Sequence, residues 1–178
     1  LAYQTAYLKT NFPYEFMTAT LNYAIDRTDR IILLKKELSK LDIEFKKPDI
    51  NYSLAKFSIE YDKNNKKSIR FGLGAIKGVG IKSMDSLASE RNKNGPYKDI
   101  IDFMSRQNKE VINKRQLEKL VQAGCFDELE KNRAKIFFNV PNFVEIFNGF
   151  SKKDSNQSLL FEDSKISFKD KNLFSQDI

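Results

Sequence analysis

The sequence predicts a mainly α-helical protein with one small β-hairpin and a flexible polar tail. Apolar residues recur at three- and four-residue steps over most of the chain, which is the period of an amphipathic helix. The stretch between Phe57 and Phe71 instead alternates apolar and polar residues, and the residues from Ser151 onward are mostly polar. With 178 residues and 40% apolar content, the chain is long enough to bury a substantial core.

The first 41 residues are predicted to be helical. Pro13 suits the first turn of a helix, where a missing N–H group costs nothing. Apolar residues then follow with helical spacing at Ile31, Leu34, Leu38 and Leu41. Pro48 ends this pattern, because proline does not continue a helix.

The alternating stretch predicts two antiparallel strands. Apolar residues alternate at Phe57, Ile59 and Tyr61 and again at Ile69 and Phe71. Polar residues 63–67 separate the two runs and form the expected turn. We therefore expect a two-stranded hairpin.

The chain is predicted to be helical again after the hairpin. An amphipathic helix is outlined by Ile81, Met84, Leu87 and Ala88, and Gly95-Pro96 ends it. Short helices are expected at residues 99–106 and 113–123. Asn113 suits the N-cap of the second, and Gly124 suits its C-terminal end.

The apolar segment after Asn132 contains Pro141, so we expect two helices there or one kinked helix. From Ser151 onward Lys, Asp, Ser and Asn dominate, which is typical of a flexible tail. The chain begins within a helical pattern and without methionine, so we expect it to be a segment of a longer protein.

Composition favours an acidic partner. The formal net charge is +7, and six cations occur between Lys63 and Lys82 without an intervening acidic residue. Nucleic acid is therefore the first candidate partner. A single cysteine and no histidine exclude an internal disulfide and a Cys/His zinc site, and favour a reducing, cytoplasmic location. No apolar run indicates a membrane span or a secretion signal.

The segment Ile76-Lys77-Gly78-Val79-Gly80 lies between an apolar turn and a helix, which is the arrangement of a helix-hairpin-helix DNA-binding motif. Two glycines allow a tight fold with exposed N–H groups, and the following helix N-terminus favours an anion. Val79 is expected to point inward, and Lys77 and Lys82 to contact phosphate. The alternative is an ordinary tight turn.

A second candidate hairpin surrounds Gly124-Cys125-Phe126-Asp127, after a helix that carries Lys114, Arg115 and Lys119. The simpler interpretation is a helix C-cap with Phe126 in the core, and DNA binding is the alternative. Cys125 is expected to be a small buried residue, because no base accompanies it.

A peptide in the tail has the character of a docking motif. Gln157-Ser158-Leu159-Leu160-Phe161 combines an amide with large apolar side chains in a polar surrounding. Such a peptide suits insertion into a pocket on another protein.

Several stretches, in order, resemble the alpha subunit of bacterial DNA polymerase III. The resemblance runs from Ala2 to at least Phe161. Residues 3–9 and 13–17 are similar to the end of the family's fingers region, and Pro48-Asp49-Ile50-Asn51 to the turn that follows. Residues 71–80 are similar to its helix-hairpin-helix entry, and residues 117–120 and 124–127 to its next landmark. Alanine is usual in the family at Cys125, and leucine at Ser158.

The resemblance implies four regions: the C-terminal part of the fingers at 1–52, a β-hairpin connector at 53–72, a helix-hairpin-helix domain at 73–150, and a flexible tail at 151–178. It implies that the tail peptide 157–161 binds the sliding clamp. The other implied partners are double-stranded DNA and further subunits of the replicative polymerase holoenzyme, with no membrane. DNA binding is assigned to Arg70, Lys77, Gly78, Val79, Gly80, Lys82, Lys114 and Arg115.

The resemblance also implies that this chain is not catalytic by itself. The family's catalytic aspartates and their Mg²⁺ ions lie in the palm, before Leu1, and the parent enzyme is a DNA-directed DNA polymerase. Asp26, Asp29 and Asp62 are expected to be solvated or capping residues. Two alternatives remain: a helix-hairpin-helix module of a DNA repair nuclease, and a helical scaffold whose basic face is merely solvated.

Overall fold

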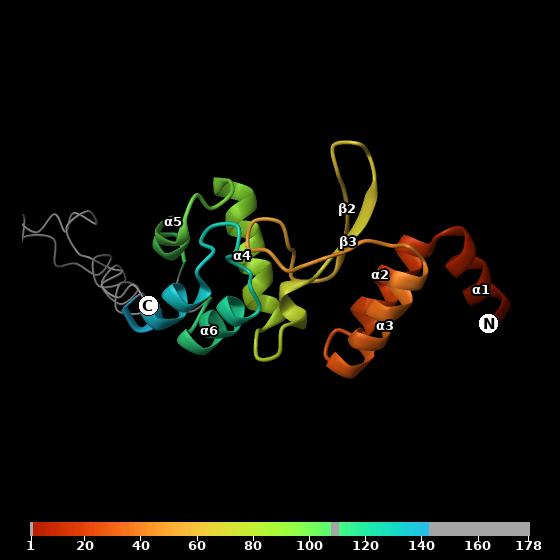
Figure 1. Cartoon of the computed structure of the whole chain (residues 1–178), viewed down its shortest axis with the longest axis horizontal. Helices are drawn as coiled ribbons and strands as arrows, with labels where there is room; N and C mark the ends of the chain where they lie inside the picture. Colours follow the sequence, from red (N-terminus) through yellow and green to blue (C-terminus); the bar gives the residue numbers. More distant parts are fainter. Residues whose placement is uncertain (1, 108–110, 143–178) are drawn as a thin grey trace, which may run out of the picture.

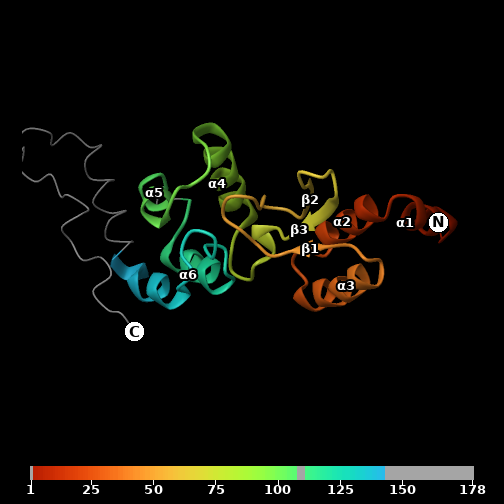
Figure 2. The same cartoon turned by 45° about the horizontal axis from the view of Figure 1, so that its top comes forward.

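The computed structural model describes residues 2–107 and 111–142. The elements follow a helical, then β, then helical order along the chain. Figures 1 and 2 show α1 to α3 at one end of the molecule, α4 to α6 at the other, and the small sheet between them. The mainly helical fold with a small β element is confirmed.

The predicted N-terminal helical region consists of three helices. They are α1 (Ala2–Asn11), α2 (Pro13–Tyr23) and α3 (Thr28–Lys40). Pro13 occupies the first turn of α2, as predicted, and α2 and α3 bury one face each. In contrast, α1 has no buried residue.

The predicted hairpin forms, and a third strand joins it. β2 (Ser58–Tyr61) pairs antiparallel with β3 (Lys67–Arg70), with Ile59 opposite Ile69. The strand β1 (Phe45–Lys46) pairs parallel with the other side of β3, so the sheet order is β1-β3-β2. The expectation of two strands was therefore one strand short, because a two-residue strand has no alternation that a pattern could reveal.

The C-terminal half begins with the short 3-10 helix η1 (Leu73–Ala75). Three helices follow, α4 (Ile81–Asn94), α5 (Ile100–Ser105) and α6 (Lys114–Gln122), close to their predicted positions. Residues 133–142 are also helical. The helix does not break before Pro141, and the rest of this segment lies outside the described residues.

The apolar side chains form two clusters. The first joins α2, α3 and the sheet, and includes Met17, Leu38 and Ile69. The second joins η1 to the C-terminal helices, and Phe103 packs edge-on between Tyr97 and Phe126. Ile81, the first residue of α4, packs against both clusters, so the start of α4 lies where the two halves meet.

Candidate nucleic-acid interface

The connection between η1 and α4 is a tight turn closed by one backbone hydrogen bond. The N–H of Val79 donates to the carbonyl oxygen of Ile76 over 3.0 Å. Gly78 stands at the third position with a φ of 88°, which L-residues rarely adopt. The Val79 side chain is buried in the second core cluster, as predicted, and anchors the turn.

The helix that follows the turn has an open N-terminus. Gly80 is the N-cap in an extended conformation, no side chain of residues 2–107 or 111–142 caps the first turn, and that turn contains no acidic residue. The first N–H groups of a helix have no intrahelical partner, and the helix dipole places positive charge there. The turn and the start of α4 together therefore favour a bound anion such as phosphate.

Helix α6 lies against the turn. A Cβ atom added at Gly78 would lie 3.8 Å from Cγ of Lys119, and one at Gly80 would lie 3.7 Å from Nε2 of Gln116. Gln116 also donates from Nε2 to the hydroxyl of Ser83 on α4, over 3.5 Å. In Figures 1 and 2 the turn lies on the lower side, between α6 and the α2–α3 connection.

Two of the predicted cations flank this turn, and two more lie at the start of the helix that packs against it. Lys77 and Lys82 flank it and are exposed, and Lys114 and Arg115 are exposed at the start of α6. Within the described ranges, none of these four side chains forms an ion pair with a carboxylate. Their charge therefore remains available to an external anion.

Lys119 belongs to the same surface although it was not assigned to the site. It lies one helical turn after Arg115, and its Cγ would be in van der Waals contact with a Cβ atom added at Gly78. The i, i+4 spacing of Arg115 and Lys119 was the signal in the sequence, because residues so spaced share a helix face. That this face of α6 lies next to the Gly78 turn is evident only from the way α6 packs in the structure.

Arg70 is the predicted site residue that the structure uses differently. Its guanidinium donates from Nε and Nη2 to the carboxylate of Glu60, over 3.0 and 2.7 Å. Nη1 donates to the carbonyl oxygen of Lys47 over 2.9 Å, and the side chain is only 11% exposed. Arg70 therefore stabilises the sheet through these hydrogen bonds and is not one of the unpaired cations near the turn.

The second candidate hairpin is a helix C-cap. Cys125 N–H donates to Leu120 O and Gly124 N–H to Val121 O, which is the Schellman pattern, and Gly124 has a φ of 79°. Phe126 is buried, so the simpler of the two interpretations is confirmed.

A side chain covers Gly124. A Cβ atom there would lie 2.3 Å from Nη2 of Arg133, whose guanidinium binds the carboxylate of Asp127 over 2.6 Å. This hydrogen bonding lowers the pKa of Asp127. The Gly124 turn therefore does not present free backbone to a phosphate as the Gly78 turn does.

The remaining polar residues have structural roles. Asp62 accepts the N–H groups of Asn64 and Lys66 over 2.8 Å each, and so caps the β-turn. Asp26 and Asp29 are exposed. Cys125 is buried, and burial raises the pKa of its thiol, which keeps it protonated and unreactive.

A shallow groove of about 430 Å³ runs beside the Gly78 turn. One wall is Gly74 to Val79, and the other is the α2–α3 connection, Ile25 to Asp29. Within residues 2–107 and 111–142, no group of three or more His, Cys, Asp or Glu side chains is placed to hold a metal ion. None of the described helices combines the length and apolar character that crossing a bilayer requires. The tail peptide, Gln157, Ser158, Leu159, Leu160 and Phe161, lies outside the described residues.

Comparison with known proteins agrees with this geometry. The family model for the helix-hairpin-helix motif matches residues 42–136, which include the Gly78 turn, α4 and α6. The chain is 37% identical over 162 residues to DNA polymerase III subunit alpha of Xylella fastidiosa (strain Temecula1). It is 40% identical over 163 residues to that of Neisseria meningitidis serogroup A, and 37% identical over 164 residues to that of Borreliella burgdorferi.

These matches cover 90–92% of this chain but only 13–14% of each relative. The chain therefore spans about one seventh of the length of the curated relatives that it matches.

Proposed function

Because this chain belongs to the helix-hairpin-helix family and matches DNA polymerase III alpha subunits over nine tenths of its length, we propose that it is the duplex-gripping segment of a replicative DNA polymerase. The turn at Gly78 and the start of α4 bind a backbone phosphate. Lys77, Lys82 and the cations of α6 bind neighbouring phosphates. The nucleotidyl transfer and its Mg²⁺ ions belong to a part of the longer polymerase outside this chain.

The observation that carries this proposal is the open N-terminus of α4. No side chain in the described part of the chain caps its first-turn N–H groups, and the tight turn with a φ of 88° at Gly78 immediately precedes them. In contrast, the N-termini of α5 and α6 are capped by Asp99 and Asn113. α2 and α3 also begin without a side-chain cap, but each has an acidic residue in its first turn, whereas α4 has none and has exposed Lys77 and Lys82 on either side of its start.

Binding of this kind is insensitive to base sequence. Backbone N–H groups and lysine side chains recognise phosphate oxygens, which are the same at every base pair. We therefore expect duplexes of different sequence to bind equally well, and affinity to fall steeply with added salt because binding releases counterions.

Gly78→Ala tests phosphate binding at the Gly78 turn, and Gly95→Ala is its matched control. Both glycines have a left-handed φ, 88° and 86°, so both substitutions strain the backbone and cost about 1–2 kcal/mol of stability. Neither new Cβ clashes, because its nearest neighbour lies at 3.8 Å or beyond 4 Å. Only Gly78→Ala is expected to lower duplex affinity, by about tenfold or more, in fluorescence anisotropy at low salt.

Two results would count against the proposal. One is equal duplex affinity for the Gly78→Ala and Gly95→Ala variants, with circular dichroism showing both folded. The other is no binding of any duplex by the unaltered chain at low salt, which would favour a helical scaffold with a solvated basic face.

We further propose that the tail peptide tethers the polymerase to its sliding clamp. The support is the peptide's composition, an amide followed by large apolar side chains in a polar surrounding, together with the match to the alpha subunits. Leu160→Ala with Phe161→Ala is expected to abolish capture of the chain by immobilised clamp. The control is Leu173→Ala with Phe174→Ala, which removes a similar apolar pair from the same tail. Equal capture of both variants would show that the peptide 157–161 does not bind the clamp.

A further inference from the structure

The chain has seven arginines, and four of them are engaged within the protein. Arg70, Arg106 and Arg133 bind carboxylates, and Arg91 donates to two backbone carbonyls. The other three are Arg27, Arg30 and Arg115, and none of them forms an ion pair with a carboxylate of the described residues. Arg115 lies on α6, but Arg27 and Arg30 lie together at the start of α3.

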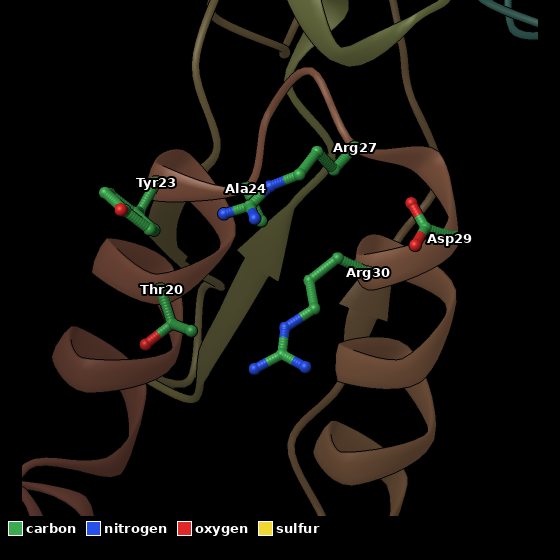
Figure 3. A pocket seen from close by; sticks show the side chains of 6 residues that line it. All are labelled: Thr20, Tyr23, Ala24, Arg27, Asp29 and Arg30. Carbon is green, nitrogen blue, oxygen red and sulfur yellow. The ribbon is translucent and has the colours of Figure 1, made fainter.

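Arg27 and Arg30 share a hollow between α2 and α3. Its volume is about 430 Å³, and its lining residues are Thr20, Tyr23, Ala24, Arg27, Asp29 and Arg30. Figure 3 shows both guanidinium groups projecting into the space between the two helices. Asp29 also lines the hollow, and in the same view its carboxylate lies on the α3 side, to the right of both guanidinium groups.

Tyr23 supports one of the two cations. The guanidinium carbon of Arg27 lies 5.4 Å from the centroid of the Tyr23 ring, within the range of a cation–π contact. The ring is 84% exposed, so this contact holds Arg27 at the surface without burying its charge. The second guanidinium, that of Arg30, faces the same space.

The hollow lies next to the Gly78 turn. Arg27 and Asp29 line both this hollow and the groove whose other wall is Gly74 to Val79. The two cavities are therefore neighbours that meet at Arg27. The α2–α3 connection and the turn also lie on the same lower side in Figures 1 and 2.

We propose that Arg27 and Arg30 form a second phosphate site, which binds the DNA backbone where it continues past the Gly78 turn. The inference rests on the proposed function of that turn. Guanidinium groups bind phosphate oxygens through paired, charge-assisted hydrogen bonds, and two of them facing one space suit a single phosphodiester group. Asp26 and Asp29 line the connecting groove, and Asp29 also lines the hollow, so the phosphate binds on the Arg30 side, where Figure 3 shows both guanidinium groups set apart from the Asp29 carboxylate.

The test compares two double variants that remove the same charge from the same helix region. Arg27→Gln with Arg30→Gln removes the proposed site, and Lys35→Gln with Lys36→Gln is the control. All four residues are exposed, so both variants are expected to fold, and the lysines do not line the hollow. Duplex affinity is measured by fluorescence anisotropy at several salt concentrations.

The arginine variant is expected to bind duplex DNA about tenfold more weakly, as the loss of one charge-assisted contact predicts. Its log affinity should fall less steeply with log salt, by about 1 in slope, because one phosphate contact is lost. The lysine variant should stay within about twofold of the unaltered chain. In a series of shortened duplexes, the unaltered chain should keep gaining affinity beyond the length at which the arginine variant stops gaining.

Other outcomes would overturn the inference. If Gly78→Ala weakens binding but the arginine and lysine double variants bind alike, the inference fails and the proposed function stands. If the unaltered chain does not bind duplex DNA, the proposed function fails and the inference fails with it. If the arginine variant loses affinity for single strands but not for duplexes, the site holds a different nucleic acid and the inference is wrong.

Discussion

At the scale of single residues, Arg91 shows how a charge is accommodated inside this protein. It is 6% exposed on α4, and its Nη1 donates to the carbonyl oxygens of Ile50 and Ser53 over 2.7 and 2.9 Å. Burial lowers the pKa of the guanidinium, and nearby Tyr97 and Asp49 partly offset that effect. Arg91 therefore joins α4 to the turn at residues 49–53, and this turn also donates from Ile50 N–H to Cys125 O.

Replacing Arg91 with leucine is expected to destabilise the fold by about 3 kcal/mol, because two buried carbonyls lose their donor. The measurement is the free energy of unfolding from urea titration by circular dichroism. Lys93→Leu serves as the control, since Lys93 is exposed on the same helix and its loss should change stability by no more than about 0.5 kcal/mol. A similar cost for the two substitutions would mean that the two hydrogen bonds do not stabilise the fold.

At the scale of the element, the helix N-termini divide into capped and open ends. α6 has a full capping box, in which Asn113 accepts from Gln116 N–H and the Gln116 side chain accepts from Asn113 N–H. α5 is capped by Asp99. α4 begins instead at Gly80, whose φ of −80° would also allow an aspartate. Leaving this end uncapped costs stability, and the open end is what the proposed phosphate contact requires.

Gly80→Asp should therefore move stability and DNA affinity in opposite directions. The new carboxylate caps α4 and interacts favourably with the positive end of the helix dipole, which should add about 0.5–1 kcal/mol to the free energy of unfolding. It also occupies the proposed anion site, so duplex affinity should fall by about tenfold or more. The nearest neighbours of a Cβ atom at Gly80 lie at 3.7 Å, so the residue fits.

The control for that substitution is Ser89→Asp, which adds the same charge on an exposed position later in α4. Thermal melting and fluorescence anisotropy give the two readouts. Equal duplex affinity of the two variants would show that the start of α4 does not bind phosphate.

At the scale of the whole molecule, ion pairs join different strands, helices and loops to one another. Glu60 on β2 binds Arg70 and Lys46, Glu90 on α4 binds Arg106, and Asp127 binds Arg133. Burial opposes the ionisation of Glu60 and Glu90, but the hydrogen bonds from their cationic partners outweigh it and lower the pKa of both. Hydrogen bonding to Arg133 lowers the pKa of Asp127.

These shifts predict that the protein loses stability in acid. A carboxyl group whose pKa is lower in the folded state stabilises the fold above its unfolded pKa, about 4 here, and loses that contribution as the pH falls through the folded pKa. Burial raises the pKa of Asp49, which acts in the opposite direction, but it is one group, whereas five carboxyl groups of the described residues have a lowered pKa: Glu15, Glu60, Asp62, Glu90 and Asp127. The melting temperature should therefore drop as the pH falls below about 4.5.

Glu60→Gln tests the contribution of one ion pair to this acid sensitivity. The variant should be less stable than the unaltered chain at pH 7, and the difference should shrink toward pH 3 as Glu60 becomes protonated. Thermal melts at several pH values provide the measurement. A constant difference across that range would contradict the assignment.

The sequence by itself determined the local features of this protein. Helical periodicity placed α2 to α6, alternation placed β2 and β3, and the glycine pattern placed the turn at Gly78 and the cap at Gly124. These features depend on residues close together in the chain, so their signals are periodicity, capping and allowed φ values. The family resemblance also came from short ordered stretches, and the comparisons confirm it.

Only the tertiary structure decided which side chains meet across the fold. It paired β1 with β3, placed Arg70 against Glu60 and Arg133 over Gly124, and brought Lys119 to Gly78. It also left Arg27 and Arg30 without a carboxylate partner among the described residues, in the hollow next to the turn. These partners lie apart in the sequence, and whether they meet depends on how the helices and strands pack. The pattern of residues along the chain does not reveal that packing. The three-dimensional arrangement of its neighbours therefore decides whether a cation forms an ion pair within the protein or remains available to bind DNA.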